Sequence, residues 1–260
     1  MKLYMKYVYL LLKSQAQYKI SFAIVLTVQF FMPFTMFAGI YLLFERFGDM
    51  QGWTLFEVFI SYAVIGICYA VGECFARGFK KFPDMIRTAS FDRVLVRPRG
   101  TVLQVLGSGF DIKRISPFIF SVIVLIVAII FGEIAWNFAR AVMLANMVIG
   151  GSLIFGGIFM LQATAAFWTI DGLEFANIFT HGIKQHAIYP LEIFPRGITV
   201  LLTFIIPFGA VTYLPLQYLL GRIDGIGWLY AFMPLAGGLF ILPCLLAWRV
   251  GVRKYSSAGS

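Results

Sequence analysis

The sequence has few charged residues and few cysteines. Only 13% of its 260 residues are charged, whereas 60% are hydrophobic and 17% aromatic, and the mean hydropathy is +0.87. A soluble domain is roughly half apolar and a quarter charged, so this chain would expose too much apolar surface to water. The cysteines, Cys68, Cys74 and Cys244, are odd in number and lie in or beside apolar segments, which argues against a disulfide framework. We therefore expect a membrane protein.

The residue patterns of common catalytic sites are also missing. No Gly-x-x-x-x-Gly-Lys-Ser/Thr loop occurs, so the chain does not hydrolyse ATP by that route. His181 and His186, the two histidines, have no neighbouring cysteine and form no His-Glu-x-x-His zinc motif, which indicates a solvated loop. Ser108 lies between two glycines, one residue short of a Gly-x-Ser-x-Gly nucleophile elbow. The sequence thus predicts a chain that is no enzyme by itself, with no catalytic residue, no metal site and no cofactor of its own.

Long apolar segments are abundant. A membrane-spanning helix needs about 20 mainly apolar residues, and reading between the charges predicts an all-α polytopic membrane protein with one domain, residues 1–260. Residues 1–19 carry four lysines among tyrosine and leucine and predict an amphipathic interfacial helix instead of a cleavable signal peptide. The predicted spans are six: Ile20–Phe44 (20–44), Leu55–Phe75 (55–75), Ile115–Phe131 (115–131), Ala141–Ile170 (141–170), Ile198–Leu220 (198–220) and Trp228–Trp248 (228–248).

The basic residues predict the orientation. All but three of the 21 Lys/Arg precede the first span or lie in residues 77–114, in the fourth loop or in the tail 249–260. By the positive-inside rule both termini are cytoplasmic. Because these residues flank apolar segments, the net charge of +9 indicates contact with membrane lipids and not with nucleic acid. The five tryptophans fall at predicted span ends, as an aromatic belt requires: Trp53, Trp136, Trp168, Trp228 and Trp248.

The loop of residues 77–114 is the most charged part of the chain, with nine Lys/Arg and three Asp. In Lys80–Ser90, a proline near the start and apolar residues at helical spacing predict a short amphipathic helix at the membrane surface. Phe91–Gly100 follows as a compact apolar and basic segment. Two interpretations remain open: a helix bound to anionic lipid headgroups, or a coupling helix that docks in a groove of a nucleotide-hydrolysing subunit.

The predicted spans contain small residues, prolines and acids. The fourth span carries Gly150, Gly151, Gly156 and Gly157, which indicate tight packing inside the subunit or a dimer or pathway surface. Pro207 and Pro215 interrupt the fifth span, and residues 215–227 are too short to cross, which predicts an outer re-entrant hairpin. Glu57 and Glu73 are the two candidate acids of a proton or sodium relay, but each lies near a span end, where we expect it to be hydrated.

The order of these features resembles the bacterial type-2 ABC exporter permeases, in particular the short six-helix group often encoded as a pair beside an ATPase. The resemblance covers essentially the whole chain, and one departure is Ala89-Ser90, where a glycine is expected before the Phe-Asp segment. The runs that carry it are Phe91–Gly100, Tyr189–Pro195, Ile206–Phe208 and Tyr213–Pro215.

The resemblance implies a permease of the bacterial cytoplasmic (inner) membrane. It would pair with a second six-helix permease, with a heterodimer favoured and a homodimer possible, and dock an ABC ATP-binding subunit that holds ATP and Mg. The implied residues are apolar anchors of the docking site, Phe82, Met85, Ile86, Phe91 and Leu95; its charged rim, Arg87, Asp92, Arg93 and Arg97; and an outer gate, Pro215, Arg222 and Asp224.

Two alternative functions differ from a permease powered by ATP. An ion-gradient-driven secondary transporter often contains inverted repeats with broken helices, but comparison of residues 1–130 with 131–260 reveals no convincing repeat. A non-transporting membrane scaffold is the other alternative. The sequence does not select a substrate.

Overall fold

The computed structural model describes residues 6–7, 9–10, 13, 17, 19–49, 52–132, 134, 136–169, 180, 182–185, 187–223 and 227–256. In these ranges the secondary structure is helical, without a strand. Most of the predicted interfacial helix, His181, His186 and Asp224 lie outside the described residues.

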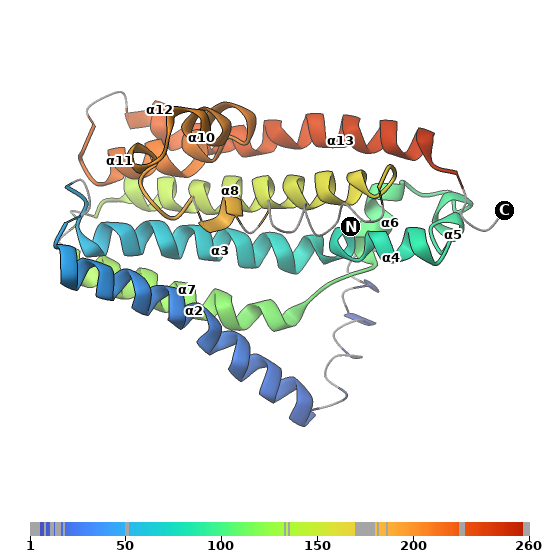
Figure 1. Cartoon of the computed structure of the whole chain (residues 1–260), viewed down its shortest axis with the longest axis horizontal. Coiled ribbons are helices and arrows are strands. Elements are labelled where there is room, and N and C mark those ends of the chain that lie inside the picture. Colours follow the sequence, from blue (N-terminus) through green and yellow to red (C-terminus); the bar gives the residue numbers. More distant parts are fainter. Residues whose placement is uncertain are drawn as a thin grey trace.

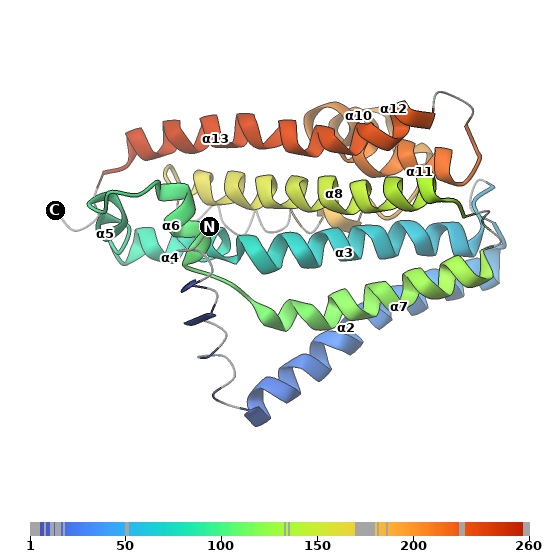
Figure 2. The same ribbon diagram turned by 180° about the vertical axis from the view of Figure 1, so that it is seen from behind.

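The long helices form a bundle (Figure 1). Helix α3 packs against α7 and α8, α8 also packs against α13, and α2 contacts α7. Figures 1 and 2 show that α2 diverges from α3 toward its amino-terminal end. The five helices are α2 (Lys19–Phe47), α3 (Leu55–Lys80), α7 (Ile115–Phe131), α8 (Phe138–Ala165) and α13 (Ala236–Lys254).

By length and composition, five helices of the described chain can each cross a membrane, and a bent helix pair makes a sixth if it counts as one span. The chain is therefore an all-α polytopic membrane protein, as the sequence predicts. The second span extends beyond its predicted end, because an apolar and largely helical stretch of 33 residues, Leu55–Arg87, runs on into the basic loop.

Polar residues between the apolar segments define where the helices begin. At the start of α3, the Glu57 backbone N–H donates to the Thr54 hydroxyl and the Thr54 N–H donates to the Glu57 carboxylate at 2.7 Å, which is a capping box. At the start of α8, the Asn137 side-chain oxygen accepts from the Arg140 N–H at 2.8 Å. Each cap satisfies a backbone donor that the first helical turn leaves without a partner.

The predicted fifth span is broken. Two helical halves, Arg196–Ile205 and Gly209–Leu219, meet at 80°. Proline at 207 has no N–H to donate, and the residue before it, Ile206, is extended (φ −116°, ψ 97°). The halves consist of α10 (Arg196–Val200) with the π-helical η3 (Leu201–Ile205), and of the π-helical η4 (Gly209–Tyr213) with α11 (Leu214–Leu219).

Of the two interruptions that the sequence predicts in the span 198–220, the structure has the one at Pro207. Pro215, where the predicted hairpin starts, instead lies buried in the first turn of α11, where a proline is tolerated. A turn with a left-handed Gly221 (φ +72°) follows α11. The chain then forms α12 (Gly227–Phe232) and η5 (Met233–Leu235) before α13.

Close glycine contacts hold α8 against its neighbours. A Cβ on Gly150 would lie 2.0 Å from the Pro234 carbonyl oxygen, and one on Gly151 would lie 2.5 Å from Cys68 Sγ. Gly157 faces Phe240 and Cys244 in the same way. These three glycines serve packing inside the subunit, whereas a Cβ on Gly156 would meet nothing within 4 Å in the described chain.

The bundle has two distinct ends. Figures 1 and 2 show α4, α5 and α6 at one end, beside the end of α13. They show α10, α11 and α12 toward the opposite end, where α3 begins. The first end is called the loop end and the second the hairpin end. The loop-end elements are α4 (Phe82–Arg87), α5 (Asp92–Leu95), α6 (Thr101–Gly107) and the 3-10 turn η1 (Ile112–Arg114).

Candidate coupling site

A tight turn separates α4 from α5 at the loop end. Ala89 has φ +50°, a left-handed conformation that is costly for alanine and easy for glycine. This is the position where the resemblance leads one to expect a glycine. The turn is held by the Phe91 N–H, which donates to the Met85 carbonyl at 3.2 Å, and by the Thr88 hydroxyl, which donates to the Asp84 carbonyl at 2.7 Å.

Beneath this turn lies an aromatic cluster, Phe82, Phe91, Phe167, Trp248 and Tyr255. The Phe82 ring centroid lies 5.0 Å from that of Phe91 and 4.8 Å from that of Trp248. Polar bonds fix its edges: Trp248 Nε1 donates to the Thr101 hydroxyl at 3.0 Å, and the Tyr255 hydroxyl donates to Asp92 Oδ1 at 2.9 Å. The cluster joins the loop to α13 and to the segment that follows α8.

The cluster corrects part of the predicted docking site. Phe82, Ile86 and Phe91 were expected to anchor a partner, but their side chains are buried inside this chain, at 0%, 6% and 0% exposure. Helical spacing identifies an apolar face and does not reveal what covers it. Met85 is half-buried and Asp92 is bound by Tyr255. These residues support the loop and offer little surface to a partner.

The remaining predicted residues form an exposed surface, called the docking face. It combines cations with two apolar side chains, Leu95 at 40% exposure and Val96 at 82%. Val96 and Arg99 are not among the predicted residues, although Val96 lies between Leu95 and Arg97 and Arg99 lies two residues further on. The docking face consists of Arg87, Arg93, Leu95, Val96, Arg97 and Arg99, all of them exposed.

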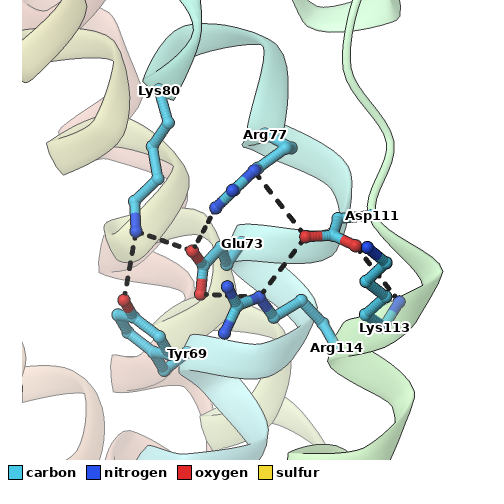
Figure 3. Close-up of polar contacts among 7 residues, drawn as sticks. All are labelled: Tyr69, Glu73, Arg77, Lys80, Asp111, Lys113 and Arg114. Carbon is cyan, nitrogen blue, oxygen red and sulfur yellow. Dashed lines mark hydrogen bonds and ion pairs between the residues drawn. The ribbon is translucent and has the colours of Figure 1, made fainter. Parts of the chain in front are cut away.

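A buried ion network lies behind the loop, centred on Glu73 (Figure 3). The Glu73 carboxylate contacts Arg77 Nη1 at 2.9 Å, Lys80 Nζ at 2.6 Å and Arg114 Nε at 3.2 Å. Asp111 lies 3.7 Å from both guanidinium groups.

Glu73 is only 1% exposed, which corrects the expectation that it is hydrated. Three cations take the place of water around the Glu73 carboxylate, and this compensates for its desolvation.

The network joins two helices. Arg77 and Lys80 belong to α3, whereas Arg114 ends η1 and leads directly into α7. The backbones also touch, because a Cβ on Gly78 would lie 1.8 Å from the Val105 carbonyl oxygen and one on Gly109 would lie 2.6 Å from the Gly78 nitrogen. The loop end is therefore in contact with both α3 and the start of α7.

The cations of the network also contact aromatic rings inside the bundle. Lys80 Nζ lies 3.2 Å from the Tyr69 hydroxyl and 4.8 Å from the Phe159 ring centroid. Lys184 Nζ lies 4.3 Å from the Tyr69 ring centroid, within the range of a cation–π interaction. Burial lowers the pKa of the Lys184 ammonium to about 8. The sequence did not indicate that this residue approaches the network.

At the hairpin end, Arg222 of the predicted outer gate joins the start of α3. Its Nε donates to Glu57 Oε1 at 3.1 Å and its Nη2 donates to the Gly52 carbonyl at 2.6 Å. The guanidinium also lies 4.5 Å from the Trp53 ring centroid, and Trp53 stacks on Tyr213 with 5.9 Å between centroids. Glu57, expected to be hydrated, thus holds an ion pair from a segment 165 residues away.

With this geometry established, comparison with protein families gives a match over residues 30–259 to a family described as ABC-2 family transporter protein. The chain belongs to this family. A comparison with curated proteins finds no match. The ABC-2 match includes the docking face, the ion network and the broken span, so these features lie in the membrane component of an ABC transporter. In general, such a component associates with an ATP-binding subunit, and this ABC-2 permease is a multi-pass membrane protein.

Proposed function

We propose that this permease exports its cargo, driven by a separate ABC ATP-binding subunit that grips the docking face. One observation carries the proposal: the docking face is exposed and basic, and it stands on the buried aromatic cluster that ties it to α13. A loop held in this way moves as a rigid body, because a packed interior resists deformation.

The composition of the docking face supports a proposal for the kind of partner surface. The docking face has four exposed arginines together with the exposed Leu95 and Val96. A groove with an apolar floor and an acidic rim would complement this surface, since helix-in-groove docking joins apolar anchors to complementary charge. We propose such a groove on the ATP-binding subunit, which would also hold the ATP and Mg²⁺. This chain would bind no cofactor.

The ion network supports the transmission of force. When nucleotide binding closes the ATP-binding subunits, the docking face would be displaced, and Glu73 with its three cations would pass the displacement to α3 and α7. The opposite end of α3 holds Arg222 through Glu57. The hairpin end would therefore open as the outer gate when α3 moves.

The proposal includes an arrangement in the membrane. The loop end and both termini would face the cytoplasm of a bacterium, since residues 77–114, which include the loop-end helices, hold nine of the 21 Lys/Arg. A second six-helix permease, either a different chain or a copy of this one, would complete the pathway. A gradient-driven carrier is less well supported, because Glu73, the acid on which it would depend, is bound by three cations.

A pull-down from membranes in mild detergent tests the proposal. The unchanged chain should retain an ATP-binding subunit, and the double variant Arg93→Glu with Arg97→Glu should lose most of it, because two repulsive charges would meet an acidic rim. Both residues are exposed, so the fold should be retained.

Arg253→Glu is the matched control, since Arg253 is exposed at the end of α13 but lies outside the docking face. It should retain the ATP-binding subunit. Equal retention by the double variant would exclude the docking face as the contact, and absence of any ATP-binding subunit from the unchanged chain would contradict the proposed function.

A further inference from the structure

A cavity of about 440 Å³ lies in the angle of the broken span. Small-molecule sites commonly have volumes of about 300–1,000 Å³. Its wall combines two runs that carry the family resemblance but have no role in docking. Leu191, Glu192 and Phe194 come from the Tyr189–Pro195 run, and Tyr213 with Leu214 comes from the second half of the broken span.

The backbone around the cavity is irregular in a way that often marks binding sites. The π-helical segments η3 and η4 stand on either side of the break at Pro207. Single π-helical turns are rare and frequently occur at functional sites. In membrane transporters, discontinuous helices often form the substrate site, because their ends offer polar groups at membrane depth. A Cβ on Gly209 would lie 3.2 Å from Leu191 Cδ1, so the two walls approach closely here.

Most polar groups of the cavity are satisfied within the wall. The Thr199 hydroxyl donates to the Leu191 carbonyl at 3.2 Å, and the Thr203 hydroxyl donates to the Thr199 carbonyl at 2.7 Å. Gln217 Nε2 donates to Glu192 Oε1 at 2.8 Å and lies 3.0 Å from the Tyr213 hydroxyl oxygen. Gln217 thus holds the Glu192 carboxylate in the wall of the cavity.

Two opposite charges therefore face the cavity. Glu192 and Arg196 both line it, both are exposed, and no ion pair joins them within the described chain. Such a pair can bind two charged groups of one ligand, because each charge keeps its capacity for a charge-assisted hydrogen bond. The apolar side chains of Leu191, Phe194 and Leu214 provide the remaining surface.

We propose that this cavity binds a zwitterionic amphiphile. Its ammonium group would pair with Glu192, its acidic group with Arg196, and its apolar body would lie against Phe194 and Leu214. That the ligand is cargo rests on the proposed function; the binding itself requires no partner subunit.

Calorimetric titration of the purified full-length chain in a nonionic detergent tests the proposal. The probes are three single-chain amphiphiles of equal chain length: lysophosphatidylethanolamine, lysophosphatidylglycerol and a primary alkylamine. The zwitterionic probe should bind about tenfold more tightly than either singly charged probe, because it alone uses both charges of the cavity.

Single substitutions at Glu192 and Arg196 test the contribution of each charge to binding separately. Glu192→Gln should weaken the zwitterionic probe and the alkylamine about tenfold and leave the anionic probe unchanged, whereas Arg196→Gln should weaken the zwitterionic and anionic probes. Glu45→Gln and Arg253→Gln, exposed residues outside the cavity, are the matched controls and should bind all three probes normally.

Three results would overturn the proposal: a singly charged probe that binds the unchanged chain best, affinities that neither cavity variant alters, or equal losses in the control variants. A failure of the ATP-binding subunit to copurify would contradict the proposed function and leave these affinities intact. The two proposals can therefore fail separately.

Discussion

At the residue scale, Glu73 shows how one acid can organise many basic groups. Its carboxylate is 1% exposed and contacts Arg77, Lys80 and Arg114, which come from α3 and η1. Removal of one partner from a buried ion pair is costly, because the remaining charge is left without compensation. The network is therefore expected to be more sensitive to loss of Glu73 than to loss of any one cation.

The variant Glu73→Gln tests this expectation. It keeps the size of the side chain but leaves three cations beside a neutral amide, and the free energy of unfolding in detergent should fall by about 3 kcal/mol. Glu45→Gln, at an exposed acid of α2, should change it by less than about 0.5 kcal/mol. Adding Lys80→Met to Glu73→Gln should recover part of the loss. Equal stability of Glu73→Gln and the unchanged chain would rule out the network as a structural centre.

The contact of Arg222 with Glu57 is a second prediction at this scale. The side chains are 26% and 15% exposed, so water screens the pair only in part. A double-mutant cycle of Arg222→Met and Glu57→Gln, read by thermal unfolding, should give a coupling of about 1 kcal/mol. Additive losses would show that the two residues are energetically independent, in spite of their contact.

At the element scale, α8 depends on close approach of backbones. Gly150 meets the Pro234 carbonyl, and a Cβ on Gly237 would lie 2.2 Å from the Gly150 carbonyl oxygen, so both sides of this contact are backbone atoms. Backbone atoms cannot adapt in the way that the end of a flexible side chain does. Two glycines on the same helix, such as Gly150 and Gly156, can therefore differ greatly in their tolerance of a methyl group.

Gly150→Ala and Gly156→Ala form a matched pair that tests this difference. The first places a Cβ 2.0 Å from a carbonyl oxygen and should destabilise the protein by about 2 kcal/mol. The second has open space and should leave stability unchanged or raise it by up to about 1 kcal/mol, since alanine favours helix. Thermal unfolding in the same detergent measures both. Equal effects would contradict the packing of α8 described above.

Helix α13 holds the loop end through a single large side chain. Trp248 is 1% exposed and touches Phe79, Phe82 and Phe91. Trp248→Ala should cost about 4 kcal/mol through the cavity it leaves, and it should reduce retention of the ATP-binding subunit although the docking face is intact.

Trp228→Ala is the control, because Trp228 is 66% exposed. Its effect on the unfolding temperature should be much smaller. Full retention of the ATP-binding subunit by a folded Trp248→Ala protein would show that docking does not need the aromatic cluster.

At the scale of the whole molecule, the two ends differ in charge and in construction. The loop end combines the docking face with the ion network, whereas the hairpin end combines the broken span with the Arg222–Glu57 contact. Helix α3 runs between them and packs against both α7 and α8. A movement that begins at one end can therefore reach the other along α3, which has a kink at Ala76 near the loop end.

Labelling with a membrane-impermeant maleimide tests the orientation. A cysteine at position 97 should react in inverted vesicles and remain protected in intact cells, whereas a cysteine at position 46 should show the reverse. Cys68 and Cys244 are 0% exposed, so only Cys74 needs replacement in the background protein. Reaction at position 97 in intact cells would place the docking face outside the cell and remove the basis for its contact with the ATP-binding subunit.

The sequence by itself determined the class of the molecule. Long apolar segments predict membrane-spanning helices because a bilayer selects for composition, and the span at 115–131 coincides with α7. The basic loop and its division into two short segments also follow from local spacing and charge. Arg87, Arg93 and Arg97 are exposed as this interpretation requires.

Only the tertiary structure decided what each of these local patterns faces. The sequence places Phe82 and Phe91 on an apolar face, whether that face binds a partner or packs inside the chain. Trp248, far along the chain, covers this face, so the two residues are buried supports and not docking anchors. Glu73 forms an ion pair with Arg114, and residues of the Tyr189–Pro195 run line a cavity together with Tyr213. Local sequence fixes the periodicity of an apolar face, whereas its partner depends on contacts between residues that are distant in the chain.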